Sequence, residues 1–134
     1  MKRNVLIVED CAVMQTVISR TLEMSRLNIG TIHTANDGKE GIERLSNGGI
    51  DLVILDINMP VMDGLEMLEE IRSREETRHI PVLIVSAESN NERVEFVASL
   101  GSGYLKKPFT PELLSREIER ICSAGIGKVR LGTN

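Results

Sequence analysis

The sequence of 134 residues is poor in aromatic side chains and in cysteine. With no tryptophan, one tyrosine and two phenylalanines, it offers no aromatic platform on which nucleic-acid bases could stack. Its two cysteines, Cys11 and Cys122, lie far apart and form no CxxC pair. Neither a disulfide framework nor a zinc knuckle is therefore indicated.

An excess of positive charge and long apolar runs are also missing. The net charge is −4 at pH 7 and the pI is about 5.3, which gives no general attraction to nucleic acid or to anionic membranes. The apolar runs are too short for a transmembrane helix, and the first residues do not resemble a signal peptide. We therefore expect a cytoplasmic protein that neither inserts into a membrane nor binds nucleic acid directly.

What the sequence does contain is a series of short apolar runs rich in β-branched residues. Residues 5–8, 52–55 and 82–85 include no polar side chain, which is typical of inner strands of a parallel sheet that are covered on both faces. Residues 29–35 and 103–106 are more polar and are expected to form the edge strands.

Helical patterns separate these five runs, so strand and helix alternate five times along the chain. This alternation predicts an α/β fold, namely a doubly wound five-stranded parallel sheet of the (βα)5 type with the flavodoxin-like strand order 2-1-3-4-5. Residues 1–122 form the single predicted domain, as expected for a chain of this length. The glycine-rich residues 123–134 are expected to be a flexible tail.

Several patterns mark the expected helices. Residues 37–40 (DGKE) and 89–92 (SNNE) have the spacing of a capping box, and Thr110 precedes Pro111 as an N-cap before a first-turn proline. An apolar stripe follows Asp10 in the first helical segment and comprises residues 13, 14, 17, 18, 21 and 22. Met24, like the other methionines in helical segments, is expected to fill the core or a groove.

Polar residues follow the strand-like runs at the points where they end. Glu9 and Asp10 follow the first run and Asp56 the third, and in the predicted order these strands are neighbours. Three carboxylates would share one crevice, where a raised pKa or a hard divalent cation relieves their repulsion. Oxygen ligands without a nearby histidine favour Mg²⁺ over zinc. Acids that only cap the following helices are the alternative, but Ser86 and Lys107 end two further runs at the same edge.

Five segments together resemble the motifs of a response-regulator receiver domain. They are Glu9-Asp10 after a buried strand and residues 35–41 (ANDGKEG), 56–64 (DINMPVMDG), 86–88 (SAE) and 107–109 (KPF). They occur in the family's order at compatible spacings, and the resemblance covers the whole chain except the tail. One departure is Ser86, where many members have threonine, so that the hydroxyl is kept and a methyl group is lost.

The resemblance implies a magnesium site. Asp10 and Asp56 would ligate Mg²⁺ directly, Asn58 would contribute its backbone carbonyl, and Glu9 would assist through a water molecule. Mg²⁺ is accordingly the expected cofactor.

The resemblance also implies a phosphorylation site and a switch. Asp56 would be the phosphoacceptor and become a 4-aspartylphosphate, while Lys107 and Ser86 would contact the phosphoryl group. Ser86 and Tyr104 would form the switch that reports phosphorylation to the surface. A carboxylate can attack phosphorus, and the transferred group is stabilised chiefly by positioning and cations, so the assigned residue types suit this chemistry.

The function implied is a phosphorylation-dependent signalling switch of a two-component phosphorelay. A histidine kinase or phosphotransfer protein would donate the phosphoryl group, and a downstream target protein would bind the altered surface. The protein would catalyse only its own phosphoryl transfer and autodephosphorylation, and would be a monomer or a weak dimer.

Other interpretations remain beside this one. The chain can be a stand-alone regulator or the receiver segment of a larger response regulator or hybrid kinase. A Mg²⁺-dependent aspartyl-phosphate phosphatase is disfavoured, because that chemistry needs a second aspartate where this sequence has Asn58. A flavin carrier is disfavoured because acids, not a phosphate-binding loop, follow the first strand. A scaffold that is not phosphorylated would retain the fold without the chemistry.

Overall fold

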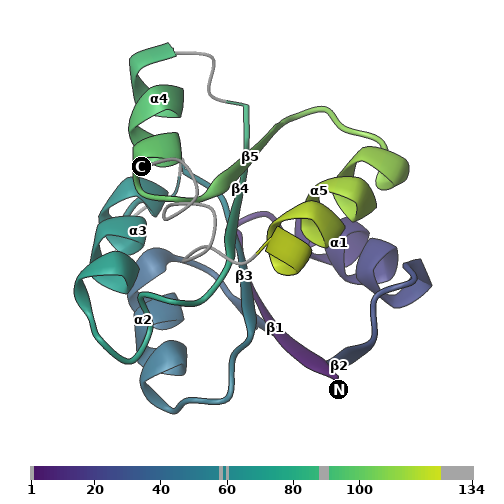
Figure 1. Cartoon of the computed structure of the whole chain (residues 1–134), viewed down its shortest axis with the longest axis horizontal. Coiled ribbons are helices and arrows are strands. Elements are labelled where there is room, and N and C mark those ends of the chain that lie inside the picture. The colour runs from purple at the N-terminus through teal and green to yellow at the C-terminus, as the bar shows by residue number, and fades with distance from the viewer. Residues whose placement is uncertain (1, 58, 60, 88–90, 125–134) are drawn as a thin grey trace.

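The computed structural model describes residues 2–57, 59, 61–87 and 91–124. Within them, five strands alternate with five helices and form one parallel sheet in the order β2-β1-β3-β4-β5 (Figure 1). This confirms the predicted fold class, strand order and edge strands. The elements are β1 (Arg3–Val8), α1 (Ala12–Met24), β2 (Ile29–Ala35), α2 (Gly38–Ser46), β3 (Leu52–Leu55), α3 (Gly64–Ser73), β4 (Val82–Ser86), α4 (Asn91–Ser99), β5 (Gly103–Lys106) and α5 (Pro111–Ala124).

Side chains alternate between the two faces of the sheet, and each face carries its own apolar core. One core joins the sheet to α1 and α5, and includes Ile18 of α1 and Ile118 of α5. The other joins it to α2, α3 and α4, and includes Leu68 of α3 and Val97 of α4. Figure 1 shows the same layers, with α1 and α5 on one side of the strands and α2, α3 and α4 on the other. Helices on both faces explain why the inner strands are apolar throughout.

Helix α1 differs from the prediction in how much of its apolar stripe is buried. Ile18 and Leu22 are buried, but Val13 is 72% exposed and Val17 is 40% exposed. Met24, expected to fill the core or a groove, is 85% exposed. The apolar stripe of α1 is therefore wider than the surface of the helix that packs against the sheet, and part of the stripe faces solvent.

The helix starts agree with the prediction in part. Asp37 accepts a hydrogen bond from the Glu40 amide at 2.9 Å, but the Glu40 carboxylate accepts from the Asn36 amide, so the expected capping box is not reciprocal. The N-cap at Thr110 is confirmed, because its hydroxyl accepts from the Leu113 amide at 3.2 Å. The capping box expected at residues 89–92 falls partly outside the described residues.

A complete capping box that was not predicted begins α3. Asp63 accepts from the Glu66 amide at 2.9 Å, and the Glu66 carboxylate accepts from the Asp63 amide. At the other end of the chain, α5 continues to Ala124, two residues beyond the predicted domain boundary. The rest of the predicted tail, residues 125–134, lies outside the described residues. None of the helices that are described combines the length and apolar content needed to cross a membrane.

The loop between β3 and α3 carries an unusual backbone conformation. Val61 has a φ of 68°, in the left-handed region that is costly for a β-branched residue. Its side chain is 75% exposed, so no burial of the isopropyl group compensates for the conformation. Local backbone strain is therefore stored in the loop that follows Asp56.

Val61→Gly is expected to raise the free energy of unfolding by about 1 kcal/mol, because glycine adopts positive φ without strain. The larger entropy that glycine loses on folding limits the gain to this size. Urea unfolding followed by circular dichroism measures the change. Val61→Ala is the matched control, since it removes the same exposed apolar group and keeps a Cβ at positive φ. An equal gain in both variants would assign the effect to the lost isopropyl group rather than to the backbone.

Candidate functional site

Three carboxylates meet where β1 and β3 end. Val8 lies opposite Leu55 in the parallel ladder, and the next residues continue it, because the Asp56 amide donates to the Val8 carbonyl at 3.0 Å. Glu9, Asp10 and Asp56 each place one carboxylate oxygen in this cluster, and the three oxygens lie within 4.8 Å of one another. Glu9 and Asp56 are buried and Asp10 is exposed, so the cluster opens to solvent at Asp10.

Lys107 brings a positive charge to this cluster from the connection between β5 and α5. Its amide donates to the Ser86 carbonyl at 2.8 Å, which extends the β4–β5 pairing by one residue. Its Nζ lies 2.8 Å from Glu9 Oε1 and 3.5 Å from Asp56 Oδ2. One ammonium group therefore joins side chains that lie 98 and 51 positions away from Lys107 in the sequence.

The electrostatics of the site reflect this crowding. Burial raises the pKa of the Glu9 carboxyl above its ordinary value; the hydrogen bond from Lys107 opposes the shift and the charge of Asp56 adds to it. For Lys107, burial lowers the pKa, but the hydrogen bond to Glu9 and the charge of Asp56 outweigh burial and leave the pKa raised. The lysine is thus firmly protonated, and one positive charge faces three acids.

The arrangement suits a hard divalent cation. Every potential ligand in the cluster is a carboxylate oxygen, the donor that Mg²⁺ prefers, and a single ammonium leaves negative charge uncompensated. Among the described residues, no other group of three or more histidine, cysteine or carboxylate ligands lies this close together. The fourth predicted ligand, the carbonyl of Asn58, lies outside the described residues.

Ser86 and Tyr104 lie on the face of the sheet that α4 covers. Val82 and Ile84 belong to the core under α2, α3 and α4, and alternation along β4 places the fully buried Ser86 on the same face. Tyr104 of β5 is opposite Ile84 and packs, half-buried, against that core. The structure thus brings the two predicted switch residues to the same face and to neighbouring strands.

Two positioning residues were not identified from the sequence. Gly64 lies against the backbone after Asp56: its amide donates to the Ile57 carbonyl at 2.8 Å, and a Cβ here would overlap the Asp56 carbonyl. Gln15 of α1 donates its side-chain amide to the Glu9 carbonyl at 2.6 Å and to Asn36 Oδ1 at 3.2 Å. Gly64 ends the 56–64 motif and could have been noticed there, whereas a glutamine in a helix gives no such signal.

Comparison with known proteins points to one family. The family model described as "Response regulator receiver domain" matches residues 5–119. The chemotaxis protein CheY-3 of Vibrio cholerae is 36% identical over 119 residues, which cover 88% of this chain and 90% of that protein. The chemotaxis protein CheY of Pseudomonas aeruginosa is 36% identical over 121 residues, 88% of this chain and 94% of that protein.

Solved structures share the fold. The chemotaxis response regulator CheY4 of Vibrio cholerae has a TM-score of 0.80 at 30% identity, covering 90% of this chain and 99% of that one. The response regulator Rcp1, solved in an Mn²⁺-bound form, has a TM-score of 0.75 at 26% identity, covering 90% of this chain and 92% of that one.

Asp10→Asn is expected to weaken Mg²⁺ binding about tenfold or more, because one anionic oxygen of a crowded cluster is lost. Thermal melts with EDTA and across a Mg²⁺ titration measure the apparent affinity, since a ligand that binds the folded state raises the melting temperature. Without metal the variant should be at least as stable as the wild type, because carboxylate repulsion is reduced.

Glu75→Gln is the matched control for this titration, because it removes one exposed acid far from the cluster. It should leave the Mg²⁺ response unchanged. A stabilisation by Mg²⁺ that survives Asp10→Asn in full would place the cation elsewhere.

Proposed function

The chain belongs to the response-regulator receiver family, and we propose that it is a phosphorylation-controlled signalling switch whose phosphoacceptor is Asp56. The observation that carries this proposal is the ammonium of Lys107, which lies 2.8 Å from Glu9 and 3.5 Å from Asp56 at an acidic sheet edge. A phosphate-sized anion would otherwise be repelled by the three carboxylates. The lysine supplies part of the positive charge that such a group requires.

The proposed reaction is phosphoryl transfer from a phosphohistidine. One carboxylate oxygen of Asp56 attacks phosphorus while the bond from phosphorus to the imidazole nitrogen breaks, and that nitrogen keeps the bonding electron pair. Asp56 becomes an acyl phosphate, and attack by water at phosphorus later restores the carboxylate. Little proton transfer is needed, so positioning and charge dominate the rate.

Asp10, Asp56 and the backbone carbonyl of Asn58 would hold Mg²⁺, with Glu9 acting through a water molecule. When bound, the cation would neutralise the acids and bring phosphoryl oxygens next to the attacking carboxylate. Glu9 contributes even without a direct metal bond, because its buried carboxylate orients Lys107 and is itself held by the Cys11 amide at 3.2 Å.

Ser86 and Tyr104 would transmit the state of Asp56 to the surface. The Ser86 hydroxyl would turn to donate to a phosphoryl oxygen, which frees space beneath α4 that the half-buried Tyr104 ring can enter. Two observations support this route. Ser86 and Tyr104 lie on the same face of the sheet, and Val97 is the one residue of α4 that is buried in the core. A helix held by so little buried surface is suited to shift between two arrangements.

The proposed partners follow from this chemistry. A histidine kinase or phosphotransfer protein would supply the phosphohistidine, and a target protein would bind the surface formed by α4, β5 and α5. The protein would act by docking rather than as an enzyme that turns over a separate substrate. The relatives named as chemotaxis proteins favour this kind of output.

Asp56→Asn is expected to abolish phosphorylation, because the amide is a far weaker nucleophile of nearly the same size. Intact-mass measurement after incubation with acetyl phosphate and Mg²⁺ should show one added phosphoryl group on the wild type and none on the variant. Asp51→Asn, directly before β3, is the matched control and should be labelled like the wild type. Equal labelling of Asp56→Asn would reject Asp56 as the acceptor.

Ser86→Ala is expected to bind beryllofluoride, a stable phosphoryl mimic, and yet to lose much of the response at α4 and Tyr104. NMR shifts of the α4 amides and of the single tyrosine report this response, whose coupling we expect to be about 1–3 kcal/mol. Ser73→Ala in α3 is the control and should respond fully. A full distal response in Ser86→Ala would show that the signal does not pass through this pair.

A further inference from the structure

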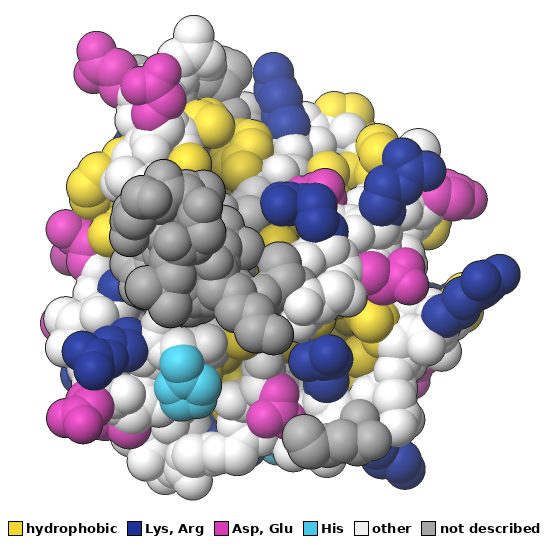
Figure 2. Space-filling view, in the orientation of Figure 1, with side chains coloured by type: hydrophobic (Ala, Val, Ile, Leu, Met, Phe, Trp, Pro, Cys, Tyr) yellow, Lys and Arg dark blue, Asp and Glu magenta, His cyan; other side chains and the backbone are white. Residues whose placement is uncertain are grey.

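Helix α4 is packed onto the protein at its C-terminal end. Its buried residue, Val97, lies in the last turn, and Leu100, directly after the helix, packs against the same core. Asn91, Glu92 and Glu95 in the first half of the helix are exposed. Figure 2 shows acidic side chains exposed over the upper end of α4, where the helix begins. The apolar packing therefore leaves the N-terminal end of α4 easier to move than the C-terminal end.

The side chain of Arg72 ties the packed end of α4 to two other segments. Its Nε donates to the Leu100 carbonyl at 2.7 Å. Its Nη1 donates to the carbonyls of Arg78 and Ile80 at 3.1 and 2.9 Å. Because Arg72 lies in the last turn of α3, one guanidinium joins α3, the connection between α3 and β4, and the residue that follows α4. A planar group with donors in fixed directions is suited to hold several acceptors in one arrangement.

The winding of α4 ends at the residue that Arg72 contacts. The Gly101 amide donates to the Ala98 carbonyl at 3.0 Å, and Gly101 has a φ of 74°, the left-handed conformation that turns a chain out of a helix. The last carbonyls of a helix carry partial negative charge, and α4 has no basic residue in its own last turn. Arg72 therefore supplies from α3 the cation that the end of α4 lacks.

The connection that the guanidinium holds is itself fixed to the core and to the sheet. The hydroxyl of the buried Thr77 donates to the Ile71 carbonyl at 2.8 Å, and the Ile80 amide donates to the Thr77 carbonyl at 2.9 Å. Ile80 is buried in the core under α2, α3 and α4, and the Pro81 carbonyl accepts from the Val53 amide of β3 at 3.0 Å. The C-terminal end of α4 is thus joined to a part of the protein that has little freedom to move.

We propose that Arg72 makes the C-terminal end of α4 a stationary pivot, so that α4 responds to phosphorylation by tilting and not by moving as a whole. This proposal rests on the proposed switch at Ser86 and Tyr104, and it specifies the motion which that switch produces. Ser86 ends β4, so a change there reaches α4 through the connection to its N-terminal end, while Arg72 holds the opposite end. Arg72 is a positioning residue, because it acts through the Leu100 carbonyl.

The expected tilt follows from the length of the helix. Because α4 has nine residues, Asn91 lies about 13 Å from a pivot at Leu100. A displacement of about 2 Å at Asn91, within the range of helix shifts in switching proteins, corresponds to a tilt of about 9°. Val97 would move about one third as far, because it is closer to the pivot. A movement of the whole helix would instead displace both ends equally and leave the helix direction unchanged.

Residual dipolar couplings, measured by NMR with and without beryllofluoride, test the proposal. They report the orientation of the N–H bonds of α4 relative to those of the strands. In the wild type the phosphoryl mimic should tilt α4 by about 9°. Arg72→Met keeps an apolar stem and removes every donor, so its tilt should be smaller by about half or more, because α4 can then move as a whole.

Two further variants sharpen this test, and circular dichroism melts check that each is folded. Arg74→Met is the matched control, because the Arg74 guanidinium pairs with Glu70 at 3.0 Å, and this variant should tilt fully. Arg72→Lys keeps a positive charge, but a compact ammonium cannot hold the carbonyls of Leu100 and Ile80 in a fixed fork. It should behave like Arg72→Met, and it tests the proposal if Arg72→Met does not fold.

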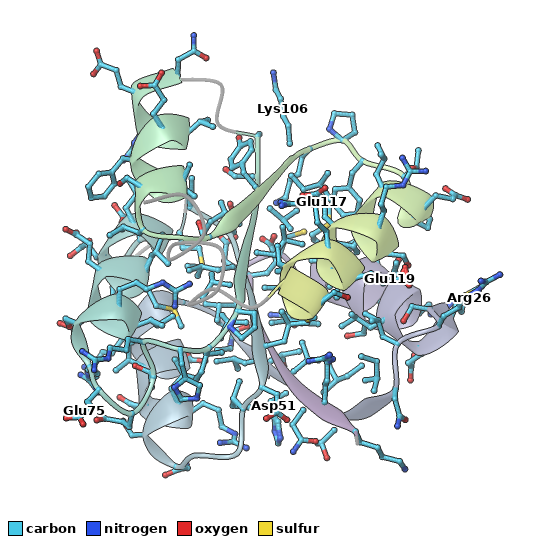
Figure 3. The ribbon with its side chains drawn as sticks, viewed as in Figure 1. Arg26, Asp51, Glu75, Lys106, Glu117 and Glu119 are labelled. Carbon is cyan, nitrogen blue, oxygen red and sulfur yellow. The ribbon has the colours of Figure 1, made fainter. Side chains whose placement is uncertain are left out.

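The pivot and the phosphorylation site lie at opposite edges of the sheet. Figure 3 shows Glu75, in the connection after α3, at the end of the molecule where Asp51 precedes β3, and Lys106 at the other end, where β5 finishes. Labelling of Asp56 by acetyl phosphate should therefore be the same in Arg72→Met as in the wild type. A tilt that decreases while labelling is unchanged is the result expected of a pivot.

Each of several results would overturn the pivot. Wild-type α4 that responds to beryllofluoride without changing its orientation would show that the helix moves as a whole. An undiminished tilt in Arg72→Met would show that the guanidinium does not hold the pivot, and a full tilt in Arg72→Lys would show that charge alone suffices. Wild-type α4 that does not respond to beryllofluoride at all would reject the proposed switch as well, so the two failures are distinguishable.

Discussion

Two buried carboxylates placed side by side are the constraint on which the rest of the site depends. Parallel pairing puts Val8 opposite Leu55, so Glu9 and Asp56 leave adjacent strands at the same level. Desolvating two like charges together is unfavourable unless cations and hydrogen bonds compensate. Lys107 reaches both, but it brings only one positive charge to a cluster that also contains Asp10. In the proposed function an incoming phosphoryl group would add further negative charge, and this is the physical reason for proposing that a cation accompanies it.

The sequence could predict the strands and the acids because both follow from one simple geometry. Strands covered on both faces must be apolar throughout, and residues just after them gather at one edge of a parallel sheet. Burial on α1 was less predictable: periodicity shows which side chains share a side of a helix, not how wide a strip the sheet covers. Val13 and Met24 are therefore exposed despite their pattern. The contacts of Gln15 and Gly64 depend on how separate elements pack, which no local pattern encodes.

The loop after Asp56 shows where local preference gives way to the needs of the site. Gly64 begins α3 so close to Asp56 and Ile57 that any side chain would displace their backbone. The chain must turn within a few residues to reach this start, and Val61 adopts a positive φ in that turn. The capping box of Asp63 and Glu66 then stabilises the first turn of α3. The unfavourable conformation at Val61 is thus accompanied by stabilising hydrogen bonds at the adjoining helix start.

The sheet separates Tyr104 from the core that α1 and α5 share. Tyr104 packs against the core under α4, whereas Ile18 of α1 and Ile118 of α5 belong to the core on the other face. Helix α5 nevertheless belongs to the proposed output surface, and Lys107 lies in the connection that leads from β5 into α5. A displacement of the Lys107 ammonium on phosphorylation would therefore act on the start of α5 directly, beside the proposed route through Ser86 and Tyr104.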